Sequence, residues 1–67
     1  STIELKAALE AVLDSLPEEL QTAFILREFS GLSYDDIAEI MDCPVGTVRS
    51  RIFRSREAID RKIRELM

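Results

Sequence analysis

The chain has 67 residues and a net charge of −4, and its 46% hydrophobic and 33% charged content is ordinary for one soluble globular domain, residues 1–67. The absence of His and the single Cys exclude most zinc sites, Cys–His nucleophiles and an internal disulfide, and two glycines cannot form a glycine-rich phosphate loop. Because the residues for these kinds of site are absent, we expect that the chain is not an enzyme. No apolar run approaches the roughly 20 residues that span a bilayer, and no signal-peptide pattern opens the chain, so we also expect a cytoplasmic protein.

Hydrophobic periodicity predicts four helices and no strand. The first helix is expected from about residue 2 to residue 15, with Thr2 as a possible N-cap. Its apolar stripe consists of Leu5, Leu9, Val12 and Leu16, widened by Ile3, Ala8 and Leu13. The second helix is expected to open at Pro17, which suits a first helical turn, and to end at Gly31 in the left-handed region. Its apolar face consists of Leu20, Ala23, Phe24, Ile25 and Leu26.

The third helix is expected to be short, from about residue 34 to residue 41. Ser33 precedes it and is expected to be its N-cap, with an acidic residue three positions on. Its buried positions are expected to be Ile37, Ala38, Ile40 and, in part, Met41. Residues 42–44 should stop this helix, because the residue before a proline is disfavoured in the helical conformation.

The fourth helix is expected from Pro44 or Val45 to about Leu66. One apolar line follows its length, at steps that keep all members on one face: Val48, Ile52, Ile59, Ile63 and Leu66. The sequence therefore predicts a long helix that packs on the other three along its whole length.

Residues 31–56 have the layout of a helix-turn-helix, with a short capped helix, a turn that holds a proline and a second helix with a basic face. In this motif the second helix enters the major groove of DNA with its N-terminal residues. The charge distribution supports this interpretation. Residues 1–48 carry 2 basic and 10 acidic side chains, whereas residues 49–67 carry 7 basic and 3 acidic ones. The chain is acidic as a whole, but its last part suits a polyanion.

The start of the fourth helix presents polar side chains away from its apolar line. At about 100° per residue, Ser50, Phe53 and Arg54 lie opposite Val48, and Arg49 flanks the line. Phe53 does not suit a core position there, but it can contact a thymine methyl group or another helix. Arg49 and Arg54 can bind guanine in a bidentate manner. This face is therefore the predicted reading surface.

Four segments of the chain carry a family pattern. They are Leu16-Pro17-Glu18-Glu19-Leu20, Leu26-Arg27-Glu28-Phe29, Gly31-Leu32-Ser33-Tyr34-Asp35-Asp36-Ile37-Ala38 and Cys43-Pro44-Val45-Gly46-Thr47-Val48-Arg49-Ser50-Arg51. Together they closely resemble the fourth conserved region of bacterial sigma factors, best the extracytoplasmic-function group, over nearly the whole chain. Asp42 departs from the glycine that many helix-turn-helix proteins have there, but Asp tolerates the left-handed region.

The resemblance implies an all-α, compact four-helix domain with a helix-turn-helix and a long C-terminal recognition helix. Such a domain recognises the −35 promoter element and docks on the β flap of RNA polymerase. The region that binds the −10 element has no counterpart in the sequence, so we expect the chain to correspond to the C-terminal domain of a sigma factor. The expected partners are double-stranded promoter DNA, the polymerase core and an anti-sigma factor. No metal, cofactor, small-molecule substrate or membrane insertion is expected.

The resemblance also implies which residues contact DNA. Those that face the groove are Arg49, Ser50, Phe53 and Arg54. Those near the phosphates are Arg27, Ser33, Tyr34, Pro44, Gly46 and Thr47. Arg51 is a further candidate for a phosphate contact, although both Arg51 and Arg56 can instead pair with acidic neighbours.

Several alternatives stay open from the sequence. The acidic first half and the outward Phe53 also fit an interaction module that an anti-sigma partner binds. The Leu-Ser-x-x-Asp-Ile-Ala pattern of residues 32–38 also occurs in the four-helix DNA-binding domains of response regulators. Gly46 either approaches a phosphate or packs tightly on the third helix. Cys43 is expected to be a partly buried turn residue.

Overall fold

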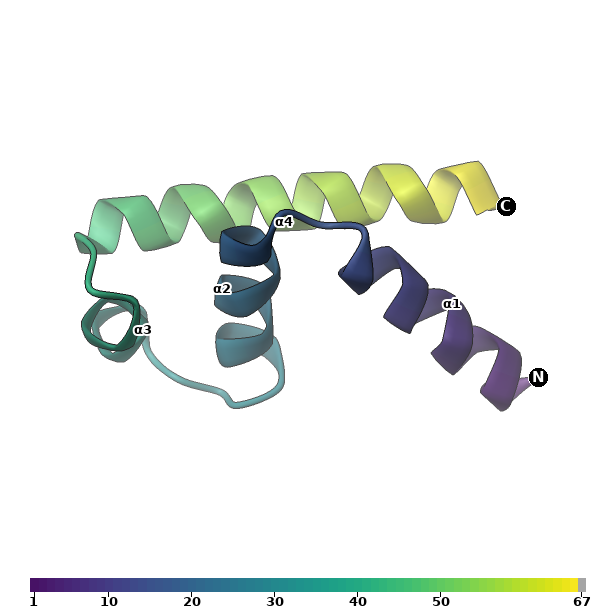
Figure 1. Cartoon of the computed structure of the whole chain (residues 1–67), viewed down its shortest axis with the longest axis horizontal. Helices are drawn as coiled ribbons and strands as arrows, with labels where there is room; N and C mark the ends of the chain where they lie inside the picture. Colours follow the sequence, from purple (N-terminus) through teal and green to yellow (C-terminus); the bar gives the residue numbers. More distant parts are fainter. Residues whose placement is uncertain (67) are drawn as a thin grey trace.

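The computed structural model describes residues 1–66, which form four helices (Figure 1). These are α1 (Thr2–Asp14), α2 (Glu18–Glu28), α3 (Tyr34–Met41) and α4 (Val45–Leu66). No strand occurs within the described residues, so the all-α, four-helix prediction is confirmed. α4 is a rod of 22 residues along one side of the molecule, and the three shorter helices lie against it. Within residues 1–66, no helix has the length and apolar character to cross a membrane.

The N-cap of α1 and both ends of α2 differ from the predicted ones. Ser1, not Thr2, is the N-cap of α1, because its Oγ accepts a hydrogen bond from the Glu4 N–H while the Glu4 carboxylate accepts one from the Ser1 amino group. α2 begins after Pro17, which is its N-cap, and ends three residues before Gly31. Gly31 nevertheless has a φ of +68°, the left-handed conformation that turns the chain toward α3.

The caps of α3 confirm the predicted signals. The Ser33 Oγ accepts a hydrogen bond from the Asp36 N–H at 3.1 Å and so satisfies one of the free donors at the helix start. Asp42 is the C-cap and has a φ of 53° in the left-handed region. The Cys43 N–H then donates to the Ala38 carbonyl at 3.0 Å. The turn is thereby closed before Pro44 begins the approach to α4.

The core consists of two clusters along α4. The first lies under the helix-turn-helix and joins α2, α3 and α4 through Ala23, Ile37, Val48 and Ile52. The second joins α1, α2 and α4 through Val12, Leu13, Leu16, Leu20 and Ile59. Each fully buried aliphatic side chain stabilises the fold by about 1.5–3 kcal/mol. Ser55 is the one buried polar side chain among the described residues, and its Oγ donates to the Ile52 carbonyl at 2.7 Å.

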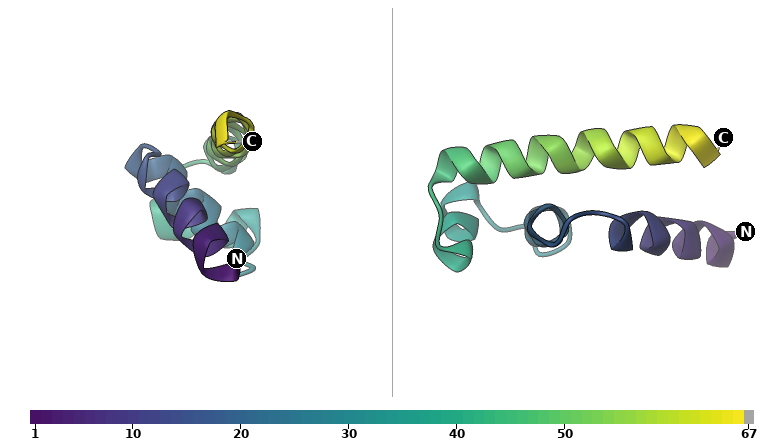
Figure 2. Two further views of the ribbon diagram at one scale, coloured as in Figure 1. Left: turned by 90° about the vertical axis from the view of Figure 1, so that its right-hand side faces the viewer. Right: turned by 45° about the horizontal axis from the view of Figure 1, so that its top comes forward.

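Some predicted core positions are wrong because the partner helices do not reach them. The sequence predicts that α4 packs on the other helices along its whole length, but Ile63 is 41% exposed and Leu66 is 67% exposed. The buried part of α4 therefore ends at Ile59. Figure 2 shows this C-terminal part of α4 running at the same end of the molecule as α1. The other apolar side chains that the sequence placed on buried faces but that the structure exposes are Ile3, Leu5 and Ile40.

Candidate nucleic-acid interface

The first turns of α4 have a buried side and an exposed side. Val48 and Ile52 are 0% and 1% exposed, because they pack on α2 and α3. Arg49, Ser50 and Arg54 are exposed, and Phe53 is 64% exposed despite its apolar ring. The helical rotation that the sequence predicts is thus present. The helix offers a face of two guanidinium groups, a hydroxyl and an aromatic ring to a partner.

Arg54 is partly oriented before any partner binds. Its Nε donates to the Ser50 carbonyl, one turn earlier, at 3.4 Å. This contact is long and exposed, so it costs little to break. It holds the guanidinium along the same exposed face as Ser50.

Three residues from three helices meet beside the start of α4. The Arg27 Nη1 donates to the Leu32 carbonyl at 2.8 Å, and the Arg27 guanidinium carbon lies 4.9 Å from the centre of the Tyr34 ring. The Arg49 guanidinium carbon lies 6.0 Å from the centre of the same ring. The end of α2, the start of α3 and the first turns of α4 therefore converge on one cationic, aromatic cluster.

The two other arginines of this region have different environments. The Arg51 Nη1 lies 3.7 Å from the Cys43 Sγ, and both side chains are half-buried. Arg56 forms an ion pair with Glu28, which is on α2. The hydrogen bond to the Glu28 carboxylate raises the pKa of Arg56 above its ordinary value. Within residues 1–66, pairing with an acidic side chain is therefore found for Arg56 but not for Arg51.

The remaining predicted site residues lie at the turns that flank α3. Ser33 and Pro44 are exposed, and Thr47 is half-buried in the first turn of α4. Gly46 is exposed, and a Cβ added there would meet nothing within 4 Å. Tight packing of Gly46 on α3 is therefore wrong as a reason for glycine at this position.

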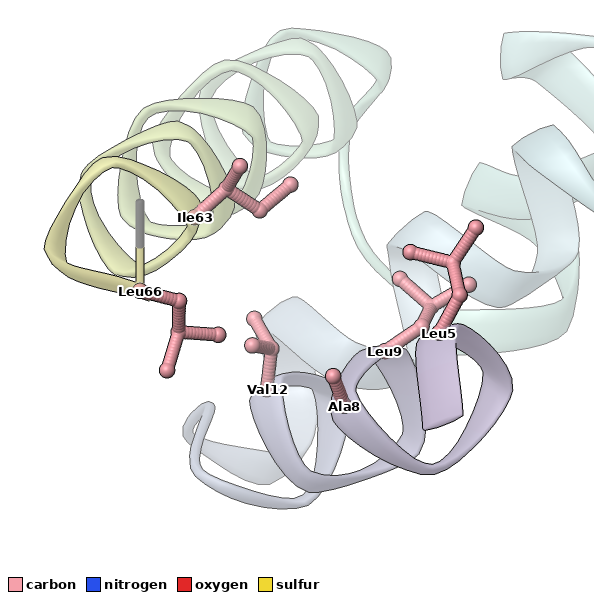
Figure 3. A pocket seen from close by; sticks show the side chains of 6 residues that line it. All are labelled: Leu5, Ala8, Leu9, Val12, Ile63 and Leu66. Atoms are coloured by element: carbon pink, nitrogen blue, oxygen red, sulfur yellow. The ribbon is translucent and has the colours of Figure 1, made fainter. Parts of the chain in front are cut away.

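Two features of the molecule escaped the sequence analysis. Glu28 was not singled out, because it lies 28 positions before Arg56 in the chain and no local spacing indicates the pair. An apolar groove of about 390 Å³ between α1 and the end of α4 was also missed. Ile63 and Leu66 project from α4 toward α1 across this groove (Figure 3). Its lining residues are Leu5, Ala8, Leu9, Val12, Ile63 and Leu66.

The comparisons with known proteins agree with the helix-turn-helix geometry. Residues 6–59 match the family described as Sigma-70, region 4. The chain is 64% identical over 64 residues to the ECF RNA polymerase sigma-E factor of Haemophilus influenzae, covering 96% of this chain and 34% of that protein. It is 61% identical over 64 residues, with the same coverage, to the ECF RNA polymerase sigma-E factor of Escherichia coli.

A third relative is the RNA polymerase sigma-H factor of Pseudomonas aeruginosa, which is 59% identical over 64 residues, covering 96% of this chain and 33% of that protein. The chain thus spans about a third of the length of the relatives it matches. These matches favour a sigma factor over the DNA-binding domain of a response regulator. The chain belongs to the sigma-70 region 4 family, and its relatives are extracytoplasmic-function sigma factors.

Proposed function

We propose that this chain is the promoter-recognition module of a transcription initiation factor and that it reads the −35 element of double-stranded DNA. The observation that carries the proposal is the exposed face of α4, where Arg49, Ser50, Phe53 and Arg54 stand opposite the buried Val48 and Ile52. A major groove about 12 Å wide admits one helix presented in this way. The module binds and does not catalyse, and it acts in the cytoplasm.

Within this proposal, the exposed face of α4 reads bases and the surrounding turns bind phosphates. Arg54 and Arg49 suit bidentate contacts with guanine, and Phe53 suits a thymine methyl group. Phosphate contacts fix the register of a helix on the duplex without reading sequence. The proposed phosphate contacts are Arg27, Ser33, Pro44, Gly46, Thr47 and Arg51, and Tyr34 lies beside them with its ring against Arg27.

The apolar groove between α1 and the end of α4 is the proposed docking surface for the β flap of RNA polymerase. A groove lined by aliphatic side chains suits an apolar helix from a partner. The exposed face of Arg49, Ser50, Phe53 and Arg54 is called the reading face. The groove lies at the opposite end of α4 from the reading face, so DNA and polymerase can be bound together. This arrangement supports a module that bridges the enzyme and the promoter.

A titration against DNA tests the proposed reading of the promoter. The chain should bind a duplex with a −35 element more tightly than a scrambled duplex, and binding should weaken steeply as salt is raised because counterions are released. Fluorescence anisotropy with both duplexes at low salt measures this. Equal affinity for the two duplexes would overturn the proposal.

Arg54→Ala should weaken binding by about 1–3 kcal/mol and relax the choice of base, because a bidentate contact carries that much discrimination. The matched control is Arg61→Ala, an exposed arginine in the later turns of α4 with the same change in charge. Anisotropy titrations with single-base variants of the site measure both effects. An equal loss of discrimination in the two variants would contradict the assignment of Arg54.

A second candidate function is an interaction module bound by an anti-sigma factor, and the exposed Phe53 favours it. A partner that covers α4 would mask the reading face, so the two functions can alternate. Hydrogen exchange on adding such a partner should show protection in α4. Protection confined to α1 and α2 would speak against masking.

A further inference from the structure

We propose that Tyr34 is a positioning residue whose ring, and not its hydroxyl, holds Arg49 in place for reading DNA. The inference rests on the proposed promoter recognition and adds a residue that sets its specificity. The observation behind it is the convergence of Arg27, Tyr34 and Arg49 at the start of α4, with both guanidinium groups against one ring.

The Tyr34 ring contacts the end of α2, which is linked by hydrogen bonds to the loop that follows it. The Leu32 N–H donates to the Leu26 carbonyl at 3.1 Å, and the Leu32 carbonyl accepts from Arg27 at 2.8 Å. Arg27 in turn lies over the Tyr34 ring at 4.9 Å. Tyr34 is half-buried and packs against the core cluster of Ala23, Ile37, Val48 and Ile52. The ring at the first residue of α3 is therefore held between Arg27 and the core.

Within residues 1–66, the Tyr34 ring is the one partner found for the Arg49 guanidinium. The Arg49 side chain is exposed, no salt bridge or hydrogen bond is found for it within residues 1–66, and its guanidinium carbon lies 6.0 Å from the ring centre. At that distance a cation is attracted by the negative face of an aromatic ring. A long side chain that is already directed loses less rotamer freedom when it binds a base. The ring therefore favours the bound position of Arg49.

The ring attracts two cations at once. The Arg27 and Arg49 guanidinium carbons lie 4.9 and 6.0 Å from the centre of the Tyr34 ring. A hydroxyl contact from Tyr34 to a phosphate is a different role, and the two roles separate by substitution.

The test compares Tyr34→Phe, which keeps the ring, with Tyr34→Leu, which keeps apolar bulk but removes it. Tyr34→Phe should bind the −35 duplex as the unchanged chain does. Tyr34→Leu should weaken binding about two- to five-fold, the value of an exposed cation–π contact. In an Arg49→Ala background, Tyr34→Leu should have a clearly smaller effect, because the contribution of the ring through Arg49 is gone and only its contact with Arg27 remains. Circular dichroism checks that each variant folds.

A measurement without DNA tests the cluster itself. The Arg49 guanidinium carbon lies 6.0 Å from the centre of the Tyr34 ring, so this ring should shift the Arg49 side-chain NMR signals. Phe53 lies one turn further along α4 and is a second source of such a shift, so the contribution of Tyr34 is the part that its substitution removes. The shift should be kept in Tyr34→Phe and reduced in Tyr34→Leu.

The outcomes separate this inference from the proposed function. Equal losses in Tyr34→Phe and Tyr34→Leu would assign the hydroxyl instead of the ring, and a full effect of Tyr34→Leu without Arg49 would remove the link between the two residues. Either result overturns the inference and leaves promoter recognition standing. If the unchanged chain showed no preference for the −35 duplex, the proposed function would fall, and this inference with it.

Discussion

At the scale of single residues, the ion pair between Arg56 and Glu28 removes one guanidinium from the cations that α4 could offer to DNA. The two side chains are 53% and 38% exposed, so the pair contributes at most about 1 kcal/mol to stability. The Glu28 carboxylate also holds the Arg56 guanidinium in an ion pair. Under the proposed function, Glu28 should therefore weaken binding to DNA of any sequence, because the pair keeps one cation of α4 from a phosphate.

Glu28→Gln should strengthen binding to scrambled DNA and make its salt dependence steeper by up to about one counterion, because Arg56 becomes free to contact a phosphate. The midpoint of thermal unfolding should change little, since the pair is exposed. Glu10→Gln is the control, an exposed residue of α1 with the same change in charge. Equal effects of the two substitutions would show that only net charge matters.

Gly46→Ala separates stability from DNA binding. A Cβ at this position meets nothing within 4 Å, and alanine favours a helix over glycine by up to about 1 kcal/mol. The variant should therefore unfold at a higher urea concentration. It should bind duplexes more weakly if the backbone of Gly46 approaches a phosphate, as proposed. Unchanged binding together with raised stability would remove Gly46 from the interface.

Sequence reasoning reached the exposed residues of α4 but not their partners. The 100° rotation per residue is a local property, so it places Arg49, Ser50 and Arg54 outward before the fold is known. The contact between Arg56 and Glu28 depends on how α2 crosses α4. That crossing is a tertiary property, and no short motif encodes it.

At the scale of elements, α3 depends on its caps because it has only 8 residues. Helices this short are not stable alone in water, so capping and packing must hold them. The Ser33 Oγ satisfies one free donor at the start of α3, and Asp42 ends the helix in the left-handed conformation. Ile37 provides the packing, as it is fully buried. α3 in turn carries Tyr34 beside the reading face.

Ser33→Ala should lower the free energy of unfolding by about 1 kcal/mol, because the Asp36 N–H loses its acceptor. Urea denaturation followed by circular dichroism measures this. Ser30→Ala is the control, since Ser30 is exposed in the preceding turn and no side-chain hydrogen bond is found for it within residues 1–66. A loss in the control as large as in Ser33→Ala would rule out the cap as the cause.

The length of α4 shows what periodicity can and cannot establish. The apolar line from Val48 to Leu66 correctly gives the face of the helix that turns inward. It does not say where the partner helices stop, and packing stops after Ile59. Beyond that point, Ile63 and Leu66 keep the apolar pattern but lack a neighbour to cover them. An apolar position predicts burial in the fold or at a partner surface, and periodicity alone does not separate the two.

At the scale of the whole molecule, α4 joins two surfaces of different character. The described residues extend 37 × 19 × 15 Å, and a helix of 22 residues is about 33 Å long, so α4 runs nearly the full length. Its start carries the cationic reading face, and its end borders the apolar groove.

Replacing Leu5 and Leu66 together by serine should abolish docking on the β flap while leaving the fold and DNA binding intact. The two side chains are 72% and 67% exposed, and substitutions at exposed positions usually change stability by no more than about 0.5 kcal/mol. Each contributes apolar surface to the groove, so their loss removes the surface that a partner helix would cover. Titration of a labelled flap domain measures docking, and anisotropy with the −35 duplex measures DNA binding.

Ile40→Ser provides the matched control for this prediction, because Ile40 is 59% exposed on α3 and does not line the groove. It should leave both flap docking and DNA binding unchanged. Docking that survives the loss of Leu5 and Leu66 would place the polymerase elsewhere on the molecule. If instead DNA binding failed along with docking, the two ends of the molecule would be coupled, because Leu5 is on α1 and Leu66 is in the last turn of α4, away from the first turns of α4 that carry the reading face.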